Sequence, residues 1–359
     1  MTILHIIAHD KFTLGYISFM QKYYSECEQL FLASKDSICS SVNVIDELKE
    51  NSSVVVYSDW KWLAFSNAIK KYIDESDIII VSGLFGFEHS IFFWPSKALN
   101  KTYIQYWGGD FYQLREKLKF WDLFKKIDRF KLLRVMDKTY GAVFLIEDDY
   151  VSFKSLTGFE KKNVYTAAMP FDPNTTYNFS EHRNHNMTCD VNVVVGNSAA
   201  IDNEHCEAFE KLKHLKQHVS VYCPLSYGDD EYREMVISLG NKYFGDKFHP
   251  VLDWMDEKDY YDFLSTMDIG IFGNNRQQGM GNIRALLSMG KKVFLRTNTS
   301  MYMYYSRIGF KCYDYESLNV CEYDDLICFP EQETNERIAD TWYTPESVKT
   351  QWDKVIYGG

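Results

Sequence analysis

Short apolar runs alternate with longer segments of mixed polarity along the chain. Six runs in the first half are rich in β-branched and aromatic residues and predict strands: Thr2–Ala8, Ser53–Tyr57, Asp77–Leu84, Thr102–Trp107, Ala142–Ile146 and Asn163–Ala167. Three segments between them predict helices: Phe12–Leu32, Trp60–Ile73 and Tyr112–Met136. This alternation is typical of βαβ units, so residues 1–172 are expected to form a doubly wound, mainly parallel α/β domain.

The alternation stops once and then resumes. Residues 173–190 are rich in Asn and polar residues and lack an apolar period, which is typical of an interdomain linker. Beyond them, four runs predict strands: Val191–Val195, Val219–Cys223, Asp268–Phe272 and Lys292–Leu295. Four segments predict helices: Glu204–Leu215, Glu231–Leu239, Glu257–Met267 and Asn282–Met289. We therefore expect a second Rossmann-like domain over 191–345, followed by a C-terminal helix over 346–359.

Two doubly wound domains joined by one linker are expected to face a central cleft. Open α/β sheets bind their ligands at the carboxyl ends of the strands. Candidate functional residues are therefore sought directly after the predicted strands.

Composition and charge narrow the class of ligand. Of the 359 residues, 46% are apolar and 25% are charged, as expected of a folded protein. The net charge of −11 argues against general binding to nucleic acid, so an anionic ligand must be bound locally. The eight cysteines form no CxxC pair, and neither a signal-peptide pattern nor a long apolar run is evident, which favours a reducing cytoplasm and predicts no membrane span.

The strongest local motif is a glycine-rich loop between a predicted strand and a predicted helix, at Arg276–Asn282. Gly279 and Gly281 permit close approach of a ligand to the backbone, the N–H groups of the helix start point towards it, and Arg276 adds a positive charge. These features predict a cradle for a diphosphate, with these donor-binding candidates: Arg276, Gln277, Gln278, Gly279, Gly281 and Asn282. Alternatively, the glycines serve only a tight turn. The loop lacks a Walker lysine and the GxGxxG pattern, which argues against an ATPase and against an ordinary dinucleotide-binding site.

A second motif follows the first strand of the second domain. Gly196, Asn197 and Ser198 offer hydrogen-bond donors at the strand end, and Asp202 or Asn203 is a candidate helix N-cap. His205 is expected in the first helical turn, facing the same loop. The alternative is an ordinary core or surface histidine.

Two aspartates in the first domain are candidate general bases. Asp110, in Trp107-Gly-Gly-Asp-Phe-Tyr, and Asp10, in the pair His9-Asp10, each follow a predicted strand. A carboxylate at that edge can take a proton from an acceptor hydroxyl. The alternative for each is a helix N-cap.

Several motifs are absent from the sequence. It contains no Asp-x-Asp, no HExxH and no G-x-S-x-G, and His182 with His185 lies in a polar stretch. We therefore expect no metal site, no cofactor and no serine nucleophile.

The segment Arg115–Lys138 holds nine basic and four acidic residues, a net charge of +5, so the remaining chain carries −16. Apolar residues are interleaved with these charges, among them Phe120, Trp121, Phe124, Phe130, Leu132 and Leu133. This pattern predicts a helix lying on an anionic membrane surface. The alternative is a solvated basic face over an ordinary buried stripe.

Four motifs occur together and in order along the chain: Trp107-Gly-Gly-Asp-Phe-Tyr, Val195-Gly-Asn-Ser with Asn203-Glu-His, Pro224…Tyr227-Gly…Glu231-Tyr, and Arg276-Gln-Gln-Gly-Met-Gly. The set resembles the bacterial TDP-4-acetamido-4,6-dideoxygalactose (TDP-Fuc4NAc) transferases, which build enterobacterial common antigen on a lipid carrier. The resemblance covers roughly residues 1 to 310. It implies a GT-B fold, a nucleotide-sugar donor held mainly by the C-terminal domain, where Tyr227 joins the donor-binding candidates, and no requirement for metal.

The expected activity is transfer of a deoxyamino sugar from a nucleotide diphosphate, TDP by resemblance, to a polyprenyl-diphosphate-linked glycan of a common antigen, O-antigen or capsule. The reaction would take place on the cytoplasmic, inner face of the bacterial inner membrane, with Asp10 or Asp110 as base. Two alternatives remain open. One is a nucleotide-sugar epimerase or hydrolase of similar form, and the other is a non-catalytic sugar-nucleotide-binding partner.

Overall fold

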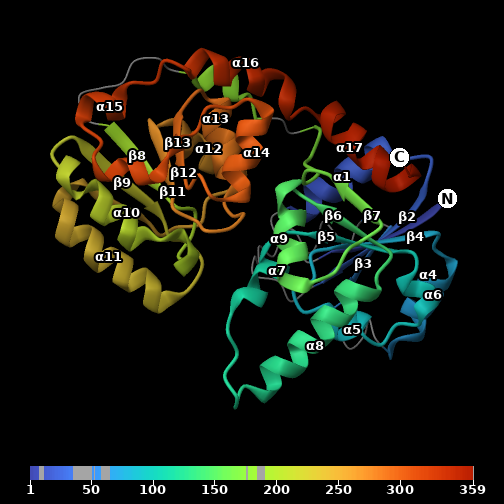
Figure 1. The fold of residues 1–359 in the computed structure, drawn as a ribbon. Coiled ribbons are helices and arrows are strands. Elements are labelled where there is room, and N and C mark those ends of the chain that lie inside the picture. The colour runs from blue at the N-terminus through green and yellow to red at the C-terminus, as the bar shows by residue number, and fades with distance from the viewer. Residues whose placement is uncertain are drawn as a thin grey trace. The chain divides into compact units, whose positions relative to one another are not determined.

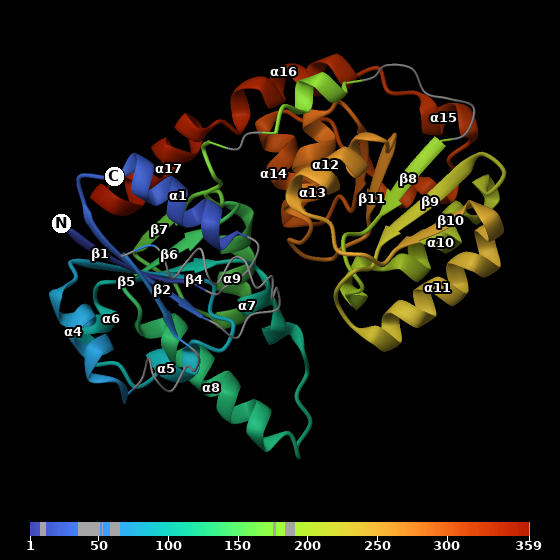
Figure 2. The same cartoon turned by 180° about the vertical axis from the view of Figure 1, so that it is seen from behind.

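A computed structural model describes residues 1–7, 12–34, 51, 53–57, 65–174, 177–183 and 191–358 (Figures 1 and 2). The chain divides into two compact units. The first comprises Met1–Thr176 and Pro345–Gly359, and the second comprises Tyr177–Thr344. Each unit is built around one parallel sheet.

The first unit contains a seven-stranded sheet in the order β3-β2-β1-β4-β5-β6-β7. Its strands are β1 Thr2–Ile7, β2 Glu28–Ser34, β3 Val54–Tyr57, β4 Ile78–Ser82, β5 Thr102–Tyr106, β6 Gly141–Phe144 and β7 Asn163–Thr166. All neighbouring strands are parallel. The strand order reverses direction between β1 and β4, so the loops after these strands diverge to opposite faces, which is where doubly wound sheets bind ligands.

Helices cover both faces of this sheet (Figures 1 and 2). They are α1 Thr13–Tyr23, α4 Asn67–Glu75, α5 Glu88–Ile91, α6 Ser96–Leu99, α7 Gly109–Tyr112, α8 Leu123–Lys138, α9 Asp148–Thr157 and α17 Pro345–Tyr357, with a 3₁₀ turn at Gln113–Arg115. One core cluster joins strand residues such as Leu4 and Ile104 to Leu132 and Met136 of α8. Burial of these apolar side chains is the main force holding the helices on the sheet.

Two predicted helices of this unit were wrong in part. The helix predicted over Phe12–Leu32 ends at Tyr23, and Glu28–Ser34 is instead β2, with Phe31 and Leu32 fully buried. A short apolar run does not distinguish a buried strand from a helix by its period, which explains the error. The helix predicted over Tyr112–Met136 is interrupted: residues 116–122 are not helical, and α8 begins at Leu123. Of the predicted helix Trp60–Ile73, residues 60–64 lie outside the described part of the chain, and α4 begins at Asn67.

The C-terminal helix α17 packs on the first unit. The ring of Trp352 is fully buried, lies edge-on to Tyr16, and donates from Nε1 to the carbonyl oxygen of Ala168 at 3.0 Å. The backbone N–H of Ala168 donates to the Gln351 side chain at 2.8 Å. The last helix is therefore part of the core of the first unit.

The second unit contains a six-stranded parallel sheet in the order β10-β9-β8-β11-β12-β13. Its strands are β8 Val191–Val195, β9 Val219–Pro224, β10 Phe248–Val251, β11 Ile269–Phe272, β12 Lys292–Leu295 and β13 Tyr313–Asp314. The four predicted strands are found within one residue of their expected bounds. Strands β10 and β13 were not predicted, because they are short and carry few branched apolar residues.

The helices of the second unit are α10 His205–Leu212, α11 Asp230–Phe244, α12 Glu257–Ser265, α13 Met280–Ser288, α14 Ser300–Ile308, α15 Tyr323–Ile327 and α16 Gln332–Trp342. One face of α12 packs on the sheet: Leu264 and, just after the helix, Met267 are buried, and Tyr260 and Phe263 pack against the same cluster. The doubly wound α/β fold predicted for both halves of the chain is therefore confirmed.

Part of the segment expected to be a linker is fixed to the second unit. The Tyr177 hydroxyl donates to Asp262 at 2.7 Å, and Arg183 donates from Nε to the Ser288 carbonyl at 3.0 Å and pairs with Asp340 at 2.7 Å. Within the described residues, no helix has the length and apolar character needed to cross a membrane.

Candidate functional site

The loop after β8 turns over a buried histidine. Gly196 has a φ of 69°, and a Cβ at this position would lie 2.7 Å from Nε2 of His205 and 3.0 Å from Oδ1 of Asn203. No other residue fits without displacing those side chains, and the left-handed φ itself favours glycine. The loop therefore depends on Gly196 for its path.

Asn203 holds this loop together from below. Its fully buried side chain donates from Nδ2 to the carbonyl of Ser198 at 2.9 Å, and its Oδ1 accepts from the backbone N–H of Asn197 at 3.2 Å. The prediction that Asp202 or Asn203 caps the following helix was wrong, because the N-cap of α10 is Glu204, which has a left-handed φ of 53° and makes no side-chain cap. Asn203 instead stabilises the loop by its hydrogen bonds to the backbone of Asn197 and Ser198.

The glycine-rich loop after β11 lies against the loop after β8. The side chain of Gln278 donates to Oδ1 of Asn197 at 3.4 Å, and a Cβ on Gly279 would lie 3.2 Å from the same oxygen. Asn274 donates from Nδ2 to the carbonyl of Asp202 at 3.0 Å. Because β8 and β11 are adjacent parallel strands, their carboxyl ends place these two loops together.

Arg276 is already engaged by a carboxylate. Its Nε donates to Oδ2 of Asp202 at 2.6 Å, and its Nη1 donates to the carbonyl of Gln277 at 3.1 Å. The side chain of Gln277 is buried. The cation is therefore held at the junction of the two loops.

The N-terminus of α13 opens beside this junction. Gly279, with a φ of 65°, is its N-cap. Among the described residues, no atom beyond its chain neighbours and its own helix backbone lies within 4 Å of the position that a Cβ on Gly281 would occupy. Asn282 in the first turn donates from Nδ2 to the hydroxyl of Tyr260 at 2.6 Å. The first turn of α13 thus has open space at Gly281, where a helix N-terminus favours an anion.

Aromatic side chains from the neighbouring loops border the junction. The hydroxyl of Tyr227, which follows β9, accepts from Nδ2 of Asn197 at 3.1 Å. The ring of Trp254, which follows β10, meets that of Tyr227 edge-on at 6.0 Å and is half exposed. Asn197 therefore contacts both the glycine-rich loop and this aromatic pair.

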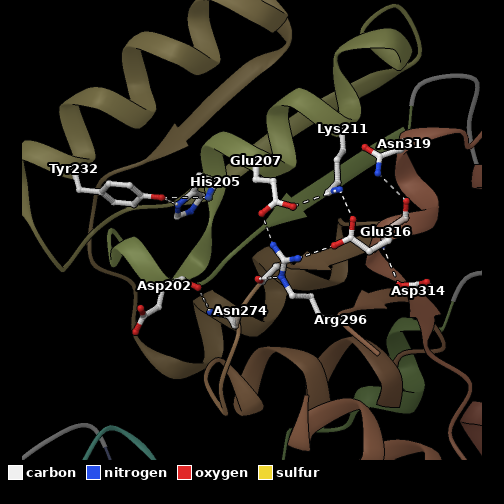
Figure 3. Close-up of polar contacts among 11 residues, drawn as sticks. Asp202, His205, Glu207, Lys211, Tyr232, Asn274, Arg296, Asp314, Glu316 and Asn319 are labelled. Atoms are coloured by element: carbon white, nitrogen blue, oxygen red, sulfur yellow. Dashed lines mark hydrogen bonds and ion pairs between the residues drawn. The ribbon is translucent and has the colours of Figure 1, made fainter. Parts of the chain in front are cut away.

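His205 lies beneath the loop. It is fully buried, and its Nδ1 is 3.3 Å from the hydroxyl of Tyr232 (Figure 3). Burial, which penalises the imidazolium, lowers the pKa of His205 to about 4. A neutral imidazole packed under Gly196 positions the loop but offers no charge to a ligand.

An ion-pair network that was not predicted from the sequence fixes the start of the glycine-rich loop. Arg296, directly after β12, donates from Nε to the carbonyl of Gly273 at 2.6 Å and pairs with Glu207 and Glu316 (Figure 3). The buried Lys211 pairs with the same two carboxylates, at 3.4 and 2.7 Å. Two cations thus face two carboxylates, and the network anchors the backbone where β11 leaves the sheet.

In the first unit, Asp110 lies at the carboxyl edge of the sheet. The chain leaves β5 through Trp107 and Gly108, which has a φ of 92°, and the Asp110 carboxylate accepts from the backbone N–H of Trp107 at 3.2 Å. The N-cap of α7 is Gly108, so the alternative of Asp110 as a helix N-cap was wrong. Its side chain is 2% exposed.

The surroundings of Asp110 favour its protonated form. Burial, together with the nearby Asp149, raises the pKa of Asp110 to about 7, although the backbone N–H groups of Trp107 and Leu84 oppose the shift. A carboxyl group with such a pKa exchanges protons readily at neutral pH and suits a general base.

A small polar and aromatic cluster accompanies Asp110. The hydroxyl of Ser82, at the end of β4, donates to Gln105 at 2.7 Å and accepts from Nε1 of Trp107 at 3.3 Å. The exposed ring of Phe85 meets Trp107 edge-on at 5.3 Å. The other candidate base, Asp10, lies with His9 outside the described residues.

The described part of the chain contains no group of three or more His, Cys, Asp or Glu side chains that could hold a metal ion. His182 instead contacts the hydroxyl of Tyr177 at 2.8 Å, and His185 lies outside the described residues.

A family model for 4-alpha-L-fucosyltransferase, glycosyl transferase group 56, matches residues 37–314. The chain belongs to this family. The matched range contains the four motifs that carried the resemblance to TDP-Fuc4NAc transferases, and that resemblance is confirmed. The protein is a glycosyltransferase.

Solved structures show the same fold at low sequence identity. HepE from Anabaena, in complex with UDP and glucose, is 10% identical over 99% of both chains, with a TM-score of 0.69. WaaG, a glycosyltransferase involved in lipopolysaccharide biosynthesis, is 11% identical over 100% of both chains, with a TM-score of 0.63. The fold is therefore GT-B, as the family resemblance implied.

The fold also occurs in another enzyme class. A putative UDP-N-acetylglucosamine 2-epimerase from Listeria monocytogenes is 12% identical over 100% of this chain and 96% of its own, with a TM-score of 0.54. The family match, and not the fold, is what distinguishes glycosyl transfer from epimerisation here.

Proposed function

We propose that this enzyme transfers a deoxyamino sugar, such as 4-acetamido-4,6-dideoxygalactose, from a TDP-linked donor to a polyprenyl-diphosphate-linked glycan. The observation that carries the proposal is the meeting of the loops after β8 and β11, at Asn197 and Gln278, beside an open helix N-terminus at Gly281. The membership in a family of sugar transferases supports it. The product would be a bacterial surface polysaccharide, as a common antigen, an O-antigen or a capsule.

The second unit would hold the donor through its diphosphate. The backbone N–H groups of the first turn of α13 carry the positive end of the helix dipole, equivalent to about half an elementary charge. Arg276 and the side-chain donor of Gln278 adjoin the same turn. When the bond between the sugar and the diphosphate breaks, the leaving group gains negative charge, and these donors stabilise it.

The aromatic pair Tyr227 and Trp254 would receive the nucleobase. Trp254 is half exposed and lies next to the ring of Tyr227, whose hydroxyl is hydrogen-bonded to Asn197, and a flat base can stack on such exposed aromatic rings. The complexes of HepE with UDP and with UDP-glucose agree with nucleotide-sugar binding by this fold.

The first unit would supply the base. The acceptor hydroxyl loses its proton to Asp110 or Asp10, its oxygen forms the new bond to the anomeric carbon of the sugar, and the diphosphate departs with the electron pair of the broken bond. Because Asp110 is buried, the proton would reach it directly from a hydroxyl inserted beside Trp107, or through one water. A lipid-linked acceptor would place the reaction on the cytoplasmic face of the inner membrane.

The reaction class is tested by incubating the protein with TDP-sugar alone and then with a lipid-linked acceptor. Transfer that requires the acceptor supports the proposal, whereas turnover of donor alone indicates an epimerase or hydrolase. Absence of turnover with intact nucleotide binding indicates a sugar-nucleotide-binding partner.

The diphosphate site is tested by Gly281→Val. The new side chain has open space within the protein, so we expect the melting temperature to be kept while TDP affinity falls about tenfold or more, the effect of losing one charge-assisted hydrogen bond. The control is Ser96→Val, which places valine in the first turn of α6 on an exposed surface. Unchanged TDP affinity in Gly281→Val would contradict the assignment.

A further inference from the structure

Six large apolar side chains are exposed around the start of α8, where a soluble protein rarely gathers them. We name these residues the apolar tip: Phe120, Trp121, Leu123, Phe124, Ile127 and Phe130. They are between 43% and 91% exposed. Single exposed apolar residues are common, but a contiguous group marks a surface that binds something.

The second half of α8 fixes the apolar tip to the first unit. Leu132, Val135 and Met136, in the second half of α8, are buried in the core. Arg134 lies over the ring of Phe92 at 5.5 Å, and Phe130 meets the same ring at 6.0 Å. Figures 1 and 2 show the first half of α8 and the segment before it projecting beyond the rest of this unit. The second half of α8 is therefore fixed in the core of the first unit, and the first half is exposed.

Lysines surround the apolar tip. The exposed lysines at this end of the segment are Lys117, Lys119, Lys125 and Lys126. The Nζ atoms of Lys126 and Lys119 lie over the rings of Phe120 and Trp121, at 5.3 and 5.8 Å. Such lysines can keep their charge in a headgroup layer while their stems and the aromatic rings enter the apolar boundary.

The acidic residues beside the apolar tip are already engaged. Glu116 pairs with Lys125 at 2.7 Å, and Asp122 accepts from the backbone N–H of Lys119 at 2.7 Å. The segment Arg115–Lys138 keeps a net charge of +5, and the remaining chain carries −16. An anionic surface therefore attracts this segment and repels the rest of the protein on average.

We propose that the apolar tip docks on an anionic lipid bilayer, with its aromatic rings below the headgroups and its lysines among them. The charge distribution favours a bilayer over a second copy of the chain, because a symmetric contact would bring one +5 segment against another. The inference rests on the proposed function only for its purpose, which is delivery of the first unit to a lipid-linked acceptor.

The test is sedimentation of the full-length protein with vesicles. We expect binding to vesicles of phosphatidylglycerol and phosphatidylcholine at low salt, less binding at high salt, and none to phosphatidylcholine alone. Lys125→Glu/Lys126→Glu should weaken partitioning by at least about 25-fold, since each basic residue near an anionic leaflet contributes roughly a factor of five. Trp121→Glu/Phe124→Glu should abolish binding without unfolding, because both side chains are exposed.

Matched controls lie in the second unit. Lys216→Glu/Lys242→Glu makes the same charge change at exposed lysines, and Met235→Glu/Val320→Glu replaces two exposed apolar residues. Both should bind vesicles nearly as the wild type does. Brominated lipid should quench the fluorescence of Trp121, and Trp121→Phe should remove that quenching.

Three results would overturn the proposal. They are a wild-type protein that stays in the supernatant at low salt, a Trp121→Glu/Phe124→Glu variant that pellets equally well, and concentration-dependent dimers in lipid-free solution that this variant abolishes. TDP binding, measured separately, should be the same in all these variants. A failure of docking is thereby distinguished from a failure of the donor site.

Discussion

The Nε atom of Arg276 lies 2.6 Å from Oδ2 of Asp202, so the cation expected to meet a diphosphate is paired with a carboxylate from the neighbouring loop. This pair joins the loops after β8 and β11. It also partly offsets the charge that Arg276 offers to an anion. The two residues should therefore have opposite effects on donor binding.

Arg276→Ala should weaken TDP binding by about 10- to 150-fold, the range expected for loss of one hydrogen bond to a charged group. Asp202→Asn should bind TDP at least as tightly as the wild type, because the full charge of Arg276 becomes available while the amide oxygen still accepts from it. Isothermal titration calorimetry measures both. Equal weakening in the two variants would mean that the pair only supports the loop.

Asp110→Asn tests the base. The amide can still accept from the backbone N–H of Trp107, so folding and TDP binding should be kept. If Asp110 is the base, turnover should fall by about 10²-fold or more, the usual contribution of general-base catalysis. If it does not fall, the same loss is expected in Asp10→Asn, and normal turnover in both variants would exclude a base at either position.

The raised pKa of Asp110 predicts a pH dependence of stability. The folded protein binds the proton of this carboxyl more tightly than the unfolded chain does, so its contribution to stability falls as the pH rises from about 4, the ordinary pKa of Asp, to about 7. Relative to the wild type, Asp110→Asn should become progressively more stable over this range and level off above it. Urea unfolding of both proteins at several pH values measures the difference, and a constant difference would contradict it.

Activity should survive EDTA. In the proposed donor site, Arg276 and the N-terminus of α13 would supply the positive charge that faces the leaving diphosphate, and we expect these to suffice without a divalent ion. Transfer rates are compared before and after EDTA treatment and after addition of Mg²⁺ or Mn²⁺. Strict dependence on either metal would refute this expectation.

Gly196→Ala should destabilise the second unit by about 1–3 kcal/mol, because the new methyl group enters a left-handed position against His205 and Asn203. Gly158→Ala is the matched control, since Gly158 has a similar φ of 73° but, apart from its chain neighbours, no described atom lies within 4 Å of its Cβ position. Gly158→Ala should lose only the stability that a left-handed φ costs a residue with a Cβ atom. Equal losses in the two variants would mean that the contact with His205 is unimportant.

Those features of the fold and the site that depend on a few neighbouring residues could be predicted from the sequence. β8 and β12 were predicted with their observed bounds because buried runs of branched residues are bordered by polar residues or glycine. The glycine-rich loop at Gly279 was found because close backbone approach demands glycine at fixed positions. Both signals are contained within a few residues.

Other features had no local signal. Arg296 and Glu207 are 89 positions apart, and Lys211 and Glu316 are 105 apart, so only the folded sheet edge brings them together. The burial of His205 under Gly196 likewise follows from tertiary packing. The exposure of Phe120 and Trp121 could not be separated from a core role by periodicity, because an apolar residue has the same pattern in either setting.

The return of α17 to the first unit has a consequence for synthesis. Residues 177–344 are an insertion between two parts of one domain, since Trp352 fills the core beside Tyr16 and Ala168. A ribosome-bound chain therefore contains the complete second unit before the helix that closes the first has been made. The inserted domain is a natural fragment for separate expression, whereas no single cut releases an intact first domain.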